Sequence, residues 1–215
     1  SYKPEIDSLR AIAVLPVIFF HANLNYFKGG YVGVDVFFVI SGYLITSIII
    51  RDLENDNFSI LKFFNSRVRR LLPLLSLICL ITLIISLFII PKDDLIDLAQ
   101  SNFAVLFYWS NFFFENSNNY FEKSSEFVPL LHTWSLSIEE QFYIFFPFLL
   151  IFLKKLKLNH YPIILTGVLF SFLLGQFGGN LKFSYPYIEN EFFFFKNSFF
   201  NKFMLPFGRL WELGA

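Results

Sequence analysis

The chain has 215 residues, of which 55% are hydrophobic and 16% charged, and its formal net charge is zero. Its single cysteine, Cys79, excludes an intrachain disulfide and gives no sign of redox chemistry. Apolar runs of about 20 residues are typical of a membrane protein rather than a soluble domain. We expect no bound metal and no nucleic-acid partner.

Five apolar segments are predicted to cross a membrane as helices, since each is close to the length that a hydrocarbon core requires. In chain order they are Ala11–Tyr26, Tyr31–Ile50, Leu71–Ile90, Leu136–Leu153 and Tyr161–Phe177. The first is marginal and carries Pro16, which a membrane helix tolerates when its neighbours satisfy the freed carbonyl. The predicted fold class is therefore an all-α, polytopic transmembrane bundle of about five full spans.

Positive charge predicts the orientation, because cytoplasmic loops collect Lys and Arg. One cationic loop follows the second span and another follows Leu136–Leu153, so both are expected inside, together with the N-terminus. Acidic residues dominate 91–133, which is expected outside. The cationic residues are Arg51, Lys62, Arg67, Arg69, Arg70, Lys154, Lys155 and Lys157.

The segment Leu98–Phe114 is apolar but interrupted by polar residues, and one crossing between the two cationic loops suffices. We therefore expect it to be re-entrant or interfacial; the alternative is that it spans and the lysine cluster breaks the charge rule. Gly178–Lys202 is expected to be an outer loop. Phe203–Ala215 resembles the opening of a further span, so residues 1–215 are expected to be the N-terminal part of one larger membrane domain.

Arg10 and His21 form the first candidate pair. Eleven helical steps return to within about 20° of the start, so both side chains share one face, roughly 16 Å apart. Ionisable groups inside a bilayer are costly and usually mark a pathway or a reaction site. A neutral His21 can act as a general base; the alternative is a histidine packed between helices and bonded to a nearby carbonyl.

Asp35 begins the second span, a short loop after His21, and could hold the imidazole in one tautomer. Gly42 lies on the same stripe, seven residues on, where it would let another helix approach closely. The alternative for Asp35 is a residue at the helix start that interacts with the positive helix end.

Two further clusters carry charge. Arg67 and Arg70 suit the phosphates of a cytoplasmic donor, although the cluster taken by itself favours a topology signal. Ser135 and Glu139 share a helix face, and either Glu139 or Glu140 could position a substrate hydroxyl or pair with an arginine, for instance Arg209. His132 and His160 are expected to be solvated or capping residues.

Taken together, these motifs resemble the acyltransferase 3 family of bacterial membrane O-acyltransferases, which includes O-antigen acetylases. The matching segments are Pro4–Arg10, His21, Gly33–Tyr43, Arg67 with Arg70, His132–Tyr143 and Arg209–Ala215. The resemblance implies transfer of an acyl group, usually acetyl from acetyl-CoA, to a hydroxyl of a cell-surface or periplasmic glycan such as lipopolysaccharide. It also implies residence in the bacterial inner membrane, among its lipids, and in many members a C-terminal esterase-like domain.

The resemblance carries over residue by residue. Arg10 and His21 match the essential motif of the first span, and Arg67 and Arg70 match donor-binding positions. The predicted catalytic residues are His21, Asp35 and Glu139; Arg10, Arg67 and Arg70 bind the donor; Trp134, Ser135, Glu140 and Glu212 bind the substrate.

The sequence leaves open whether His21 acts as a base or itself accepts the acyl group. A transporter or flippase of lipid-linked saccharides, a structural protein and an inactive fragment are the alternatives in function.

Overall fold

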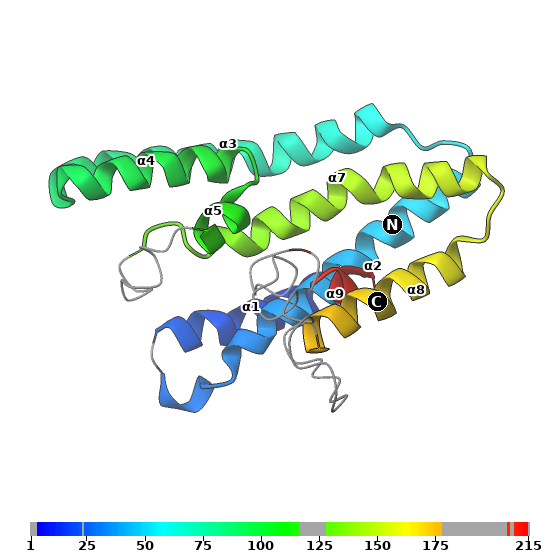
Figure 1. Cartoon of the computed structure of the whole chain (residues 1–215), viewed down its shortest axis with the longest axis horizontal. Helices are drawn as coiled ribbons and strands as arrows, with labels where there is room; N and C mark the ends of the chain where they lie inside the picture. The colour runs from blue at the N-terminus through cyan, green and yellow to red at the C-terminus, as the bar shows by residue number, and fades with distance from the viewer. Residues whose placement is uncertain (1–3, 23, 117–127, 178–205, 207–208, 215) are drawn as a thin grey trace, which may run out of the picture. The chain divides into compact units, whose positions relative to one another are not determined.

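A computed structural model of the chain describes residues 4–22, 24–116, 128–177, 206 and 209–214, and all regular structure in these ranges is helical (Figure 1). The predicted all-α class is confirmed there. The α-helices are α1 (Pro4–His21), α2 (Gly33–Glu54), α3 (Ile60–Ile89), α4 (Lys92–Leu106), α5 (Ser110–Asn116), α7 (Thr133–Lys155), α8 (His160–Phe177) and α9 (Leu210–Gly214). Two short 3₁₀ turns, Asn25–Phe27 and Gly30–Val32, join α1 to α2.

Among the described residues, three helices are long and apolar enough to cross a membrane: Gly30–Glu54, Ile60–Ile89 and Thr133–Lys155. They correspond to three of the five predicted spans. The predicted span Tyr161–Phe177 lies in α8, whose apolar stretch, His160–Leu173, is shorter. The predicted span Ala11–Tyr26 is also shorter than expected, because α1 ends at His21.

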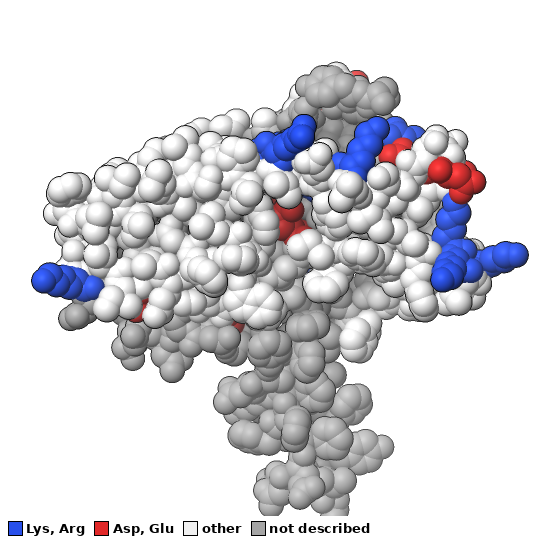
Figure 2. All heavy atoms as spheres, turned by 90° about the horizontal axis from the view of Figure 1, so that it is seen from above, with Lys and Arg blue, Asp and Glu red and all other residues white. Residues whose placement is uncertain are grey.

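Most of the visible described surface is uncharged (Figure 2). Large apolar side chains lie exposed along α3, Phe88 to 85%, as expected of a helix that faces lipid. The protein is therefore a membrane protein, and its orientation stays a prediction.

Three helices continue through a proline. Pro16 lies inside α1, Pro73 inside α3 and Pro147 inside α7. Each proline removes one helical hydrogen bond, but ending the helix in an apolar medium would leave several backbone groups unsatisfied. The predicted tolerance of Pro16 is confirmed, because α1 continues through it to His21.

The described contacts divide the chain into two units, and the first consists of residues Ser1–Glu54, Phe148–Asn201 and Pro206–Ala215. In this unit α1 packs along α2, and α9 lies against both α2 and α8 (Figure 1). Lys154 in the last turn of α7 donates a hydrogen bond to the carbonyl of Leu53 near the end of α2. The two ends that carry cationic residues thus lie side by side, as the charge pattern predicts.

Small residues allow the helices of the first unit to approach closely. A Cβ atom on Gly33 would lie 2.1 Å from the carbonyl oxygen of Ala13, and one on Gly42 would lie 1.9 Å from that of Leu213. Both distances are far below van der Waals contact, so only glycine fits. The predicted close approach at Gly42 is confirmed, and the helix that makes it is α9.

The second unit, Asn55–Pro147 with Lys202–Leu205, contains α3, α4, α5 and the first part of α7. The predicted segment Leu98–Phe114 is not one continuous helix here, because α4 ends at Leu106 and α5 begins at Ser110. Tyr108 adopts φ 53°. The amides of Tyr108 and Trp109 donate to the carbonyls of Val105 and Ala104, the Schellman arrangement that ends a helix.

Polar groups fix α5 onto α7 within the second unit. The hydroxyls of Ser110 and Ser137 lie 2.7 Å apart, and Thr133 donates to Ser110 at 3.1 Å. The amides of Asn111 and Gln141 exchange two hydrogen bonds, of 3.3 and 2.9 Å. Two of the polar residues that interrupt the predicted segment, Ser110 and Asn111, therefore find partners inside the protein, which stabilises polar groups in an apolar medium.

The predicted outer loop Gly178–Lys202 lies outside the described residues. Of the predicted span opening Phe203–Ala215, the described part contains the short helix α9.

Replacing Gly42 with alanine should separate α9 from α2. We expect the Gly42→Ala variant to lose about 1–3 kcal/mol of stability, because the added methyl group overlaps the backbone of Leu213. The matched control is Gly167→Ala in α8, where the new methyl group would meet nothing within 4 Å apart from the adjoining residues and backbone of its own helix, and there alanine should be neutral or stabilising by about 1 kcal/mol. Thermal unfolding in detergent measures both, and equal midpoints would contradict the close packing.

Candidate functional site

His21 is the last residue of α1, and its imidazole is exposed. Its Nδ1 atom lies 2.8 Å from the carbonyl oxygen of Val17, one turn back. A carbonyl can only accept a hydrogen bond, so Nδ1 carries the proton in the neutral ring and Nε2 carries the basic lone pair. The carbonyl contact considered as an alternative to catalysis is thus present, and it also prepares the ring to act as a base.

Arg10 lies on the same helix, eleven residues before His21. Its Nη2 atom donates to the hydroxyl of Ser41 at 3.4 Å, and its guanidinium lies over the Phe37 ring, 4.8 Å from the centroid. Both partners belong to α2. Arg10 therefore fixes α1, which carries His21, against α2.

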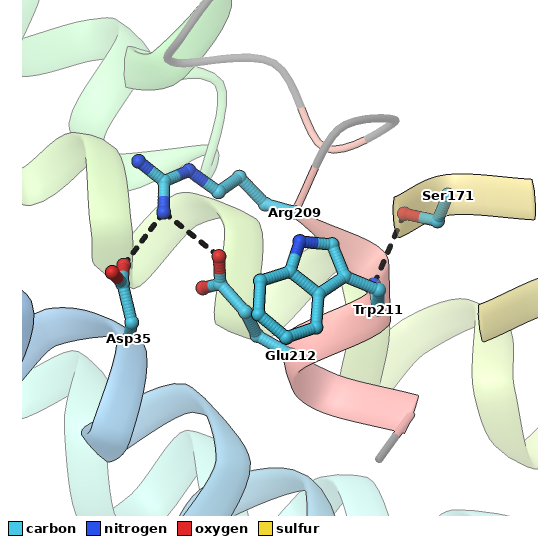
Figure 3. Close-up of polar contacts among 5 residues, drawn as sticks. All are labelled: Asp35, Ser171, Arg209, Trp211 and Glu212. Carbon is cyan, nitrogen blue, oxygen red and sulfur yellow. Dashed lines mark hydrogen bonds and ion pairs between the residues drawn. The ribbon is translucent and has the colours of Figure 1, made fainter. Parts of the chain in front are cut away.

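A partly buried ion triad joins α2 to the short helix α9 and to Arg209, which precedes it (Figure 3). The Nη1 atom of Arg209 donates to Asp35 at 2.6 Å and to Glu212 at 2.8 Å. The side chain of Glu212 is only 1% exposed, and its Oε2 atom has no hydrogen-bond partner within the described residues. The backbone amide of Trp211 donates to Ser171 on α8 at 3.0 Å, so α9 is anchored on two helices.

The triad gives Asp35 a different partner from the one that the sequence predicts. The sequence predicts that its carboxylate orients His21, but that carboxylate pairs with Arg209, and the Nδ1 atom of His21 is bonded to the carbonyl of Val17. The helix-start position of Asp35 is confirmed, because it lies in the first turn of α2. A partner 174 residues away in the chain could not be found from local spacing. Its catalytic role, like the substrate-binding role of Glu212, stays a prediction.

The second unit holds Arg67 on α3. Its guanidinium carbon lies 3.7 Å from the centroid of the Tyr143 ring and 5.0 Å from that of Phe63. Its Nη1 atom lies 3.7 Å from Oε1 of Glu140. The suggested ion pair between an α7 carboxylate and an arginine is therefore present, but the arginine is Arg67 rather than Arg209. Arg70 follows three residues later and is exposed.

The remaining α7 residues make contacts within the second unit. The Tyr143 hydroxyl donates to Oε1 of Glu139, and the hydroxyl of Ser135 donates to the carbonyl of His132 at 3.1 Å. Trp134 packs against the apolar pair Phe114 and Val128. The donor and substrate roles predicted for these side chains stay predictions, and so does the catalytic role of Glu139.

Sequence reasoning missed the part played by Tyr143. Its position four residues after Glu139 is the signal that could have found it, since such residues are neighbours on one helix face. No group of three or more His, Cys, Asp or Glu side chains suited to a metal ion occurs within the described ranges.

Comparison with known proteins decides the family. Residues 3–208 match the family model described as an acyltransferase domain. The chain belongs to this family. It is 45% identical over 159 residues to the peptidoglycan O-acetyltransferase OatA of Listeria monocytogenes, which covers 73% of this chain and 25% of that protein. It is 40% identical over 154 residues to the O-acetyltransferase OatA of Staphylococcus aureus, covering 71% and 25%. The chain thus spans about a quarter of the length of these relatives, and no solved structure matches it.

Removing the arginine of the triad should destabilise the first unit more than removing an exposed arginine. The Arg209→Leu variant leaves Asp35 and Glu212 without their shared partner, so we expect a loss of about 3–5 kcal/mol. The control is Arg51→Leu, because Arg51 is 57% exposed and pairs with Asp52 at the surface; its loss should stay below about 1 kcal/mol. Unfolding in detergent measures both variants, and a similar cost for each would show that the triad is not buried in the protein.

Proposed function

We propose that the complete protein is a membrane O-acyltransferase that moves an acetyl group from acetyl-CoA to a hydroxyl of a cell-wall glycan. Membership of the acyltransferase family supports the class of reaction. The observation that carries the mechanism is the His21–Val17 hydrogen bond of 2.8 Å, because it gives an exposed imidazole a basic Nε2 at the end of a helix that Arg10 fixes in place.

In the proposed reaction, Nε2 of His21 removes the proton from the acceptor hydroxyl as the oxygen attacks the thioester carbonyl. The new C–O bond forms, the C–S bond breaks, and the CoA thiolate leaves with the proton that the imidazolium returns. The bond from Nδ1 to the carbonyl of Val17 strengthens while the ring is positively charged, because a charged donor makes the stronger hydrogen bond. The ring is thereby stabilised at the moment when it carries the proton.

Donor and acceptor follow from different observations. Arg67 and Arg70 present cations that suit the phosphates of CoA. The Listeria relative is named a peptidoglycan O-acetyltransferase, which favours peptidoglycan as the acceptor. We accordingly propose that the acyl group crosses the membrane from a cytoplasmic donor to an external acceptor.

Acetyl transfer should depend on His21. With the complete protein in membranes, labelled acetyl-CoA and peptidoglycan fragments, we expect the His21→Ala variant to lose at least about 100-fold in rate, since a positioned base contributes that much. The matched control is His160→Ala at the start of α8, which lies outside the proposed chemistry and should keep its rate.

Two results would contradict the proposal. Full transfer by the His21→Ala variant would remove His21 from the chemistry. Absence of transfer by the folded wild-type protein, with several glycans and acetyl-CoA supplied, would favour the transport alternative.

A further inference from the structure

Arg67 is held in place through the flat face of its guanidinium group. This stacking contact does not use the N–H groups, which are its hydrogen-bond donors. The stack on Tyr143, at 3.7 Å from the ring centroid, needs no N–H group. The distance to Glu140, 3.7 Å, is an ion pair but exceeds hydrogen-bond length. Within the described residues, no hydrogen bond engages the guanidinium. Its planar fork of five donors is therefore fixed in place and still able to bind an oxyanion.

Tyr143 is itself fixed. The ring is 3% exposed, its hydroxyl donates to Glu139, and its edge meets the ring of Phe142 at 6.2 Å between centroids. A tyrosine locked at both its ring and its hydroxyl holds the guanidinium in one place, so that little conformational entropy is lost when a ligand binds.

Glu140 is the second side chain that holds Arg67 in place. Its carboxylate is buried, at 6% exposure, and the nearby Arg67 supplies the opposite charge that such a group requires. Arg70, three residues after Arg67 on α3, is exposed and adds a second cation on a neighbouring position of the helix. Together the two arginines suit a ligand with more than one phosphate group.

We propose that Tyr143 and Glu140 are positioning residues that seat Arg67 for the phosphate groups of the acyl-CoA donor. This inference rests on the proposed function, and it assigns to Tyr143 a role that the sequence did not give it. It also gives Glu140 a task on the donor side rather than in holding the acceptor. Anionic lipid headgroups share the phosphate chemistry, so the test must separate the two sources.

The test compares ring removal with hydroxyl removal. In the complete protein, Tyr143→Leu removes the stack, whereas Tyr143→Phe keeps the ring and loses only the hydroxyl. We expect the Leu variant to bind CoA about tenfold more weakly, a loss between those of an exposed and a desolvated cation–π contact, and the Phe variant to bind within about threefold of wild type. The KM for acetyl-CoA should rise in parallel and change by a larger factor than kcat, which a merely unstable variant would not show.

A second variant guards against misfolding of the Leu variant. Arg67→Lys keeps the charge but loses the planar fork and the stack, so it should also weaken CoA binding about tenfold. Tyr161→Leu, which removes a tyrosine that is 68% exposed on α8, serves as the control and should bind like wild type.

The outcomes are distinct. Binding is measured by titrating CoA into protein in nanodiscs of phosphatidylcholine, with and without phosphatidylglycerol. Equal CoA affinity for wild type, Tyr143→Leu and Arg67→Lys would overturn the inference. The inference would also be overturned by variants that lose only the binding of phosphatidylglycerol, because Arg67 would then bind lipid headgroups rather than CoA. A folded wild-type protein that binds no CoA would instead overturn the donor in the proposed function.

Discussion

The guanidinium of Arg209 is the group on which the packing of the first unit depends. It faces Asp35 and the buried Glu212, whose carboxylate would be costly to bury without an opposite charge. The residue after Glu212 brings its carbonyl onto Gly42, so the ion triad and the closest helix contact occur side by side. With α2 held in this way, Arg10 reaches Ser41 and fixes α1, which ends at His21. The proposed base is thus positioned through a sequence of contacts that begins near the end of the chain.

Much of the helical framework follows from the sequence, because the length of an apolar run determines whether a helix can satisfy its backbone across a membrane. The three long candidate spans were predicted for this reason, but the prolines inside two of them, Pro73 and Pro147, were not considered. The break between α4 and α5 was not located, since Tyr108 adopts a conformation with positive φ that usually indicates glycine. A tyrosine gives no such signal. Its backbone carbonyl accepts a hydrogen bond from Gln141, 33 residues later, and this tertiary contact accompanies the unusual conformation.

The candidate site was predictable where it depends on spacing within one helix. Gly42 as a point of close approach followed from its stripe, and the shared helix of Arg10 and His21 followed from eleven residues of periodicity. The partners of charged groups were not predictable, because Asp35 and Arg209, or Arg67 and Glu140, meet only after folding. One sequence shows which charges must be paired in an apolar medium but does not show how they pair. A bond from His21 to a nearby carbonyl was one of the two alternatives that the sequence left open, but the sequence did not show which carbonyl makes it, because every residue has one.

The central claim is that Asp35 acts through Arg209 and leaves the tautomer of His21 to the carbonyl of Val17. A double-mutant cycle tests this most directly, with acetyl transfer measured for wild type, Asp35→Asn, Arg209→Gln and the double variant of the complete protein. If Asp35 works through Arg209, the double variant should be no slower than the slower single variant, because the second change removes a partner that has already been lost. Losses that multiply would show that Asp35 contributes independently of Arg209, as it would if it oriented His21 itself, and would contradict this account.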